Sequence, residues 1–122
     1  MSRTHKIAIL GALLIASVLR LWGFTTESLL WHPDEFHFVY WPLLFYSGDL
    51  NPHFFSYPSL HFYLLALVYG CHFLWQWLLG TGWTLAEWAS FYFFWNPDYL
   101  LGTARLVSIT FAVGTAGWVG LL

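Results

Sequence analysis

Four ionisable side chains stand within six positions of the segment Trp31–Phe38: His32, Asp34, Glu35 and His37. Apolar sequence flanks this segment on both sides, and charged residues make up only 8% of the chain. Grouping such side chains in an apolar sequence costs solvation free energy unless they are hydrated or paired. Carboxylates and imidazoles are also the groups that most often move protons or bind metal ions. The segment is therefore the first candidate for a functional site.

Two interpretations of this segment follow from the residues alone. Asp34 and Glu35 come directly after Pro33, which suits a first helical position, and carboxylates in a first turn complement the helix dipole. Alternatively, His32, Asp34, Glu35 and His37 are all possible ligands of a divalent metal. On a helix Asp34 and His37 share a face, whereas Glu35 points elsewhere and His32 precedes the helix. The four do not converge, so a metal is not the favoured interpretation and no cofactor is established.

Composition places the chain in a membrane. Of its 122 residues 59% are hydrophobic and 23% aromatic, more apolar surface than a soluble domain of this size can bury. Lys and Arg together number four and the net charge is -2, so there is no basic cluster for a nucleic acid partner. The single cysteine excludes an internal disulfide.

Three apolar segments, at about 7–24, 59–79 and 99–122, are predicted to cross the bilayer as helices. The first is followed by no small-residue cleavage site, so we expect an uncleaved anchor rather than a signal peptide. Arg3 and Lys6 precede it, which predicts a cytoplasmic amino terminus and an external loop over 25–58. The fold class is thus all-α integral membrane, in a multi-pass protein of the cell (plasma) membrane.

Two shorter helices are predicted between the spans. An external juxtamembrane helix runs from Pro33 to just before Gly48. Thr84 and Glu87 have the spacing of a capping box, and Asn96-Pro97 ends the helix they begin, which is expected along the cytoplasmic interface. Small residues recur at every fourth position of the third span and predict close packing against another helix: Ser108, Ala112, Ala116 and Gly120.

Several motifs, taken in order, carry a resemblance to a known family. They are Arg20-Leu21, His32-Pro33-Asp34-Glu35, Gly48-Asp49-Leu50-Asn51-Pro52, the run from Tyr57 to Leu65, and Ala104-Arg105-Leu106-Val107-Ser108. The chain resembles the amino-terminal part of the polytopic glycosyltransferases that include protein O-mannosyltransferases and lipid A aminoarabinose transferases, of GT-C fold and similar to glycosyltransferase family 39. The resemblance covers nearly the whole chain. Family members are several times longer, and this chain ends at Leu122 within apolar sequence, so we expect a fragment of a larger bundle.

The resemblance implies transfer of a sugar from a polyprenyl-phosphate lipid to an acceptor on the external face. It implies that Asp34 is the base for the acceptor hydroxyl and that Glu35 supports it. Arg20 and Arg105 match family positions where a cation would help the departing phosphate, and His32 and Tyr57 are expected to bind substrate. The implied partners are membrane lipid, the lipid-linked donor, and further carboxyl-terminal spans or a partner membrane protein.

A second function from another class also fits the residues. The chain could be a small non-catalytic membrane subunit, whose aromatic loop and small-residue stripe pack against partner helices. On the glycosyltransferase interpretation, the 122 residues alone are expected to be inactive, because the spans that hold the lipid donor would be missing.

Overall fold

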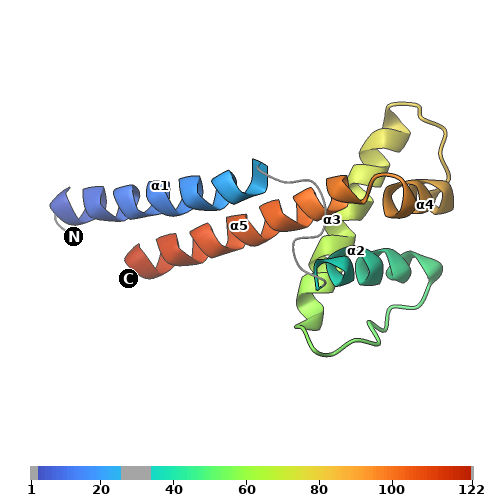
Figure 1. The fold of residues 1–122 in the computed structure, drawn as a ribbon, viewed down its shortest axis with the longest axis horizontal. Helices are drawn as coiled ribbons and strands as arrows, with labels where there is room; N and C mark the ends of the chain where they lie inside the picture. Colours follow the sequence, from blue (N-terminus) through green and yellow to red (C-terminus); the bar gives the residue numbers. More distant parts are fainter. Residues whose placement is uncertain (1–2, 26–33, 122) are drawn as a thin grey trace. The chain divides into compact units, whose positions relative to one another are not determined.

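The computed structural model describes residues 3–25 and 34–121, and helices joined by loops make up this part of the chain (Figure 1). The described residues form no strand, which confirms the predicted all-α class for them. The elements are α1 (Arg3–Thr25), α2 (Glu35–Leu44), the 3-10 helix η1 (Phe45–Ser47), α3 (Ser59–Leu78), α4 (Leu85–Phe94) and α5 (Pro97–Leu121).

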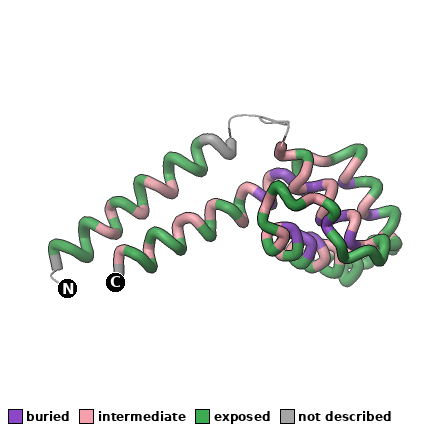
Figure 2. Tube along the Cα trace, turned by 90° about the horizontal axis from the view of Figure 1, so that it is seen from below, coloured by how far each residue is buried: buried purple, intermediate pink, exposed green. Residues whose placement is uncertain are grey.

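The described residues belong to two compact units. The two-helix unit contains α1 and α5 from Arg105 onward, and the α3 unit contains residues 34–104, including the first part of α5. Buried residues concentrate in the α3 unit, whereas residues 4–22 of α1 are all exposed or intermediate (Figure 2). The hydrophobic core of this chain therefore lies among α2, α3, α4 and the start of α5.

Within the described part of the chain, two helices are long and apolar enough to cross a membrane. They are Thr4–Trp22 within α1 and Pro97–Gly120 within α5, matching the first and third predicted spans. None of the α1 window and 17% of the α5 window is buried. Such exposed apolar surface needs lipid or a partner to cover it. The helix α3 forms where the second span was predicted but does not reach the same hydropathy, because it carries His61, His72 and Gln76.

Two glycines of α5, only one of which belongs to the predicted small-residue stripe, approach α1 closely. A Cβ atom placed on Gly120 would lie 3.3 Å from Ile9 Cγ2, and one placed on Gly117 would lie 3.5 Å from Leu13 Cδ1. Ser108 and the other members of the stripe are exposed or only partly covered in this structure. The close approach therefore uses one predicted position, Gly120, and one that the four-residue spacing did not include.

A proline inside α2 leaves one backbone carbonyl of that helix without its usual hydrogen-bond donor. Pro42 lies buried in the helix interior and has no N–H, so the Phe38 carbonyl loses its usual donor four residues later. The Tyr69 hydroxyl of α3 lies 3.0 Å from that carbonyl and 3.0 Å from the Leu100 carbonyl of α5. A hydroxyl has one proton, and the Phe38 oxygen is the acceptor that has no other backbone donor. Tyr69 thus supplies the hydrogen bond that the backbone of α2 cannot supply to the Phe38 carbonyl.

The predicted capping box opens α4. The Thr84 hydroxyl accepts from the Glu87 amide at 3.3 Å, and the Glu87 carboxylate accepts from the Thr84 amide at 2.8 Å. The helix ends at Phe94, before Asn96-Pro97, as predicted. Trp88 and Tyr92 are buried against α3, whereas Trp95, which follows the last residue of the helix, is 82% exposed.

Candidate functional site

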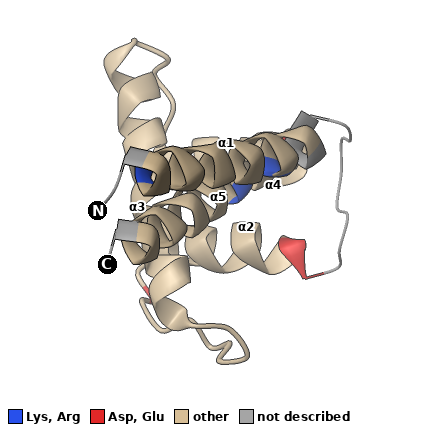
Figure 3. Ribbon diagram, turned by 90° about the vertical axis from the view of Figure 1, so that its left-hand side faces the viewer, with Lys and Arg blue, Asp and Glu red and all other residues tan. Residues whose placement is uncertain are grey.

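The candidate site lies at the start of α2, where Figure 3 shows acidic residues in the first turn. Asp34 is the N-cap residue and Glu35 is the first residue of the helix. The Asp34 carbonyl accepts from the His37 amide at 3.1 Å, but its side chain makes no capping hydrogen bond. The helix thus begins at Glu35, two residues later than a first helical position at Pro33 would place it. The Asp34 carboxylate is not used to satisfy the free amides of the helix.

The Asp34 carboxylate is instead engaged by the Tyr57 hydroxyl. The hydrogen bond that Tyr57 donates to Asp34 raises the pKa of Tyr57, and partial burial and the negative charge of Asp34 act in the same direction. Tyr57 therefore stays protonated and remains a donor at neutral pH. In this structure Tyr57 holds the carboxylate, and its predicted contact with substrate stays a prediction.

Aromatic rings lie around Tyr57. The Tyr57 ring lies 5.5 Å from the Phe38 ring and 5.7 Å from the Phe54 ring, measured between centroids. The His37 ring stacks on Phe54 at 4.3 Å, with an angle of 20° between the planes. The Nε1–H of Trp41 donates to Nδ1 of His37 at 3.1 Å. The result is a half-buried carboxylate beside a wall of flat side chains.

The loop that brings Tyr57 to Asp34 is held by hydrogen bonds of its own. Gly48 ends η1 in the left-handed conformation, at φ 96°, which favours glycine. Asp49 then accepts from the Asn51 amide at 2.9 Å and pairs with His53 Nε2 at 2.6 Å. The Tyr63 hydroxyl donates to the Leu50 carbonyl at 2.7 Å and ties the loop to α3. These bonds turn the chain back toward the start of α2.

We expect acid to release this loop. Hydrogen bonds from the His53 side chain and the Asn51 amide hold the pKa of Asp49 below its ordinary value of 3.8. A lowered folded-state pKa stabilises the loop above pH 3.8, and the contribution is lost as the pH falls through the lower value. An NMR titration of the Asn51 amide from about pH 6 to about pH 2 should show a midpoint below 3.8. The Asp49→Asn variant should lose that transition, and a midpoint above 3.8 in the unchanged protein would contradict the expectation.

The remaining predicted site residues lie elsewhere or outside the described part. Arg20 is exposed on α1 and Arg105 is partly exposed on α5, and both belong to the two-helix unit, whereas Asp34 and Tyr57 belong to the α3 unit. The proposed contact of either arginine with a phosphate stays a prediction. His32 lies outside the described residues.

The metal interpretation gains no support from the described residues. Within residues 3–25 and 34–121, no three His, Cys, Asp or Glu side chains gather closely enough to hold a metal ion. His37 Nδ1 is occupied by the Trp41 N–H, and a metal on Nε2 would need a proton on Nδ1, which would break that bond. The i,i+4 spacing of His37 and Trp41 was the signal in the sequence for this bond.

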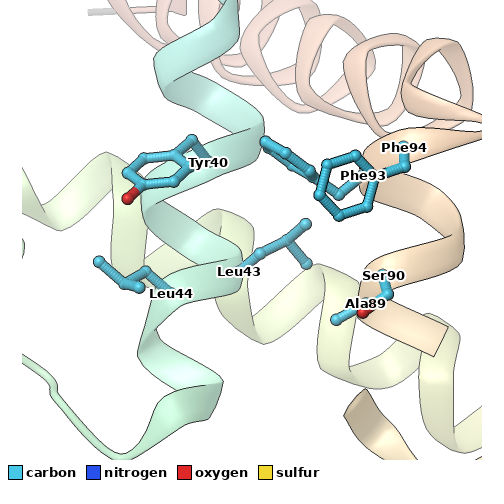
Figure 4. Close-up of a pocket in the computed structure, with 7 residues that line it drawn as sticks. All are labelled: Tyr40, Leu43, Leu44, Ala89, Ser90, Phe93 and Phe94. Atoms are coloured by element: carbon cyan, nitrogen blue, oxygen red, sulfur yellow. The ribbon is translucent and has the colours of Figure 1, made fainter. Parts of the chain in front are cut away.

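An apolar groove of about 190 Å³ lies between α2 and α4 (Figure 4). The side-chain hydroxyls in its lining are those of Tyr40 and Ser90. The lining residues are Tyr40, Leu43, Leu44, Ala89, Ser90, Phe93 and Phe94. The groove contains no ionisable carboxylate or imidazole, so it offers packing surface and no acid-base chemistry.

Comparisons with known proteins provide no relative for this chain. No family model, curated protein or solved structure matches it significantly.

Proposed function

We propose that this chain is part of a membrane glycosyltransferase that moves a sugar from a polyprenyl-phosphate lipid to an acceptor hydroxyl on the external face. The observation that supports it best is the placement of Asp34. Its carboxylate is held by the Tyr57 hydroxyl beside an aromatic wall and is not used as a helix cap. A carboxylate used only to complement the helix dipole would not need a second segment of the chain to orient it.

The proposed reaction is a substitution at the anomeric carbon. The acceptor oxygen forms a bond to that carbon while the bond to the phosphate oxygen of the carrier breaks. The acceptor proton passes to Asp34, and the bonding electrons leave with the polyprenyl phosphate, which departs as an anion. Glu35 supports the base, and flat aromatic side chains such as Tyr57 and Phe54 suit the faces of a sugar ring.

We further propose that α3 is a third span, with its polar side chains turned inward. The Gln76 amide lies 3.0 Å from His72 Nε2 and 2.7 Å from the Tyr92 hydroxyl, so the Gln76 side chain and His72 Nε2 are partnered within the α3 unit. The outward side chains are apolar and exposed: Leu60, Tyr63, Leu67, Leu74 and Leu78. From Leu60 to Leu78 this face extends about 27 Å, close to the ~30 Å of a hydrocarbon core. Lipid is the occupant that such a face fits.

Labelling of cysteines on either side of α3 tests this topology. In a Cys71→Ala background, Ser56→Cys and Ala86→Cys place single probes at exposed positions that flank the helix. An impermeant maleimide added outside intact cells should label Ser56→Cys and spare Ala86→Cys, because three spans with a cytoplasmic amino terminus put these positions on opposite sides. A permeant maleimide should label both. Equal labelling of both by the impermeant reagent would exclude α3 as a span.

The groove between α2 and α4 favours a second candidate function. Its lining is almost wholly apolar and includes Leu43 and Phe93, which suits a helix of another membrane subunit. A non-catalytic packing subunit would use this surface and would have no need for Asp34. Sugar transfer by the full-length protein, measured with polyprenyl-phosphate-linked mannose and aminoarabinose, distinguishes the two functions.

A further inference from the structure

The tautomer of His37 is set by a neighbouring indole. Trp41 Nε1–H donates to His37 Nδ1 at 3.1 Å, one helical turn away. An indole nitrogen can only donate, so Nδ1 must present its lone pair. In the neutral imidazole the ring proton then sits on Nε2. His37 can therefore donate a hydrogen bond through Nε2–H.

The position of this ring is also fixed. The His37 ring stacks on Phe54 at 4.3 Å, and its centroid lies 6.4 Å from that of the Tyr57 ring. Its backbone amide donates to the Asp34 carbonyl at 3.1 Å. The ring is only partly buried, so it lies at the edge of the site beside Asp34 and Tyr57. Stacking and the Trp41 bond together leave it little rotational freedom.

We propose that His37 Nε2–H binds an oxygen of the sugar-phosphate donor, and that Trp41 is a positioning residue that keeps the ring in the donating tautomer. This inference rests on the proposed function. The oxygen atoms of a sugar and of its phosphate are the hydrogen-bond acceptors that a neutral N–H donor can bind. In this tautomer His37 donates a hydrogen bond and does not compete with Asp34 for the acceptor proton.

Two substitutions at His37 separate donation from stacking. His37→Phe keeps a ring for Phe54 but has no N–H, and we expect kcat/KM to fall about 10-fold, the worth of one hydrogen bond. His37→Gln places an amide N–H in nearly the same position, and its loss should stay within about 3-fold. Equal losses for polyprenyl-phosphate-linked mannose and aminoarabinose assign the contact to phosphate oxygen, and unequal losses assign it to the sugar.

A spectroscopic measurement tests the tautomer without any activity. In protein with ¹⁵N-labelled histidine, the neutral ring of His37 should show the Nε2–H tautomer, and Trp41→Phe should convert it to a mixture. The same variant should lower kcat/KM by less than His37→Phe does, because only part of the population no longer donates.

The outcomes distinguish this inference from the proposed function. An Nδ1–H tautomer in the unchanged protein overturns the inference whatever the activity. Full transfer by His37→Phe, when Asp34→Asn is inactive, overturns the inference and leaves the proposed function standing. Absence of transfer from both donors by the full-length protein overturns the proposed function, and the role of His37 with it.

Discussion

Asp34→Asn in the full-length protein is expected to lose sugar transfer by about 10²- to 10⁴-fold, the usual contribution of a general base. Asn keeps the size of Asp and can still accept the hydrogen bond from Tyr57, but it cannot take the proton of the acceptor hydroxyl. The fold and membrane insertion should therefore be unchanged. Transfer from polyprenyl-phosphate-linked mannose and aminoarabinose, normalised to folded protein, measures the effect.

Glu35→Gln provides the matched control for Asp34→Asn. Glu35 is the first residue of α2 and is assigned a supporting role, so a neutral acceptor at this position should reduce transfer less. If the two carboxylates only complement the helix dipole, both variants should instead lose about 0.3–1 kcal/mol of stability, with activity per folded molecule almost unchanged. Near-normal transfer by Asp34→Asn would exclude it as the base.

Tyr69→Phe is expected to destabilise the α3 unit by about 1–3 kcal/mol. The substitution removes only the hydroxyl, which leaves the Phe38 carbonyl without a donor, because Pro42 cannot supply one. Tyr69 is fully buried, so water cannot replace the lost bond without opening the core. Equilibrium unfolding in detergent, followed by tryptophan fluorescence, measures the change in free energy.

Tyr63→Phe is a control with the same chemistry in a different environment. The Tyr63 hydroxyl also donates to a backbone carbonyl, that of Leu50 at 2.7 Å, but the side chain is 41% exposed. Water can take over that bond, so we expect a loss below about 1 kcal/mol. Similar losses in the two variants would show that the Phe38 carbonyl does not depend on Tyr69.

Features that depend on residues close in sequence were predicted from the sequence alone. The hydrophobic runs predicted α1, α3 and α5 to within a few residues, since apolar length and flanking breakers act along the chain. The capping box at Thr84 and the stop before Asn96-Pro97 were also predicted, because every group involved lies within four residues. The site residues Asp34 and Glu35 came from a motif of adjacent residues, and their roles as base and support stay predictions.

Contacts between distant residues required the tertiary structure. Tyr57 meets Asp34 only because the loop after Gly48 turns back, and no periodicity encodes that return. Tyr69 reaches the Phe38 carbonyl across 31 positions of sequence, to satisfy an acceptor whose need arises from Pro42. The hydrophobic periodicity of a helix predicts which of its faces is apolar, but it does not predict which polar atom lacks a hydrogen-bond partner. Side-chain hydrogen bonds are directional and short, so only the packed positions of α2, α3 and the loop decide which pairs form.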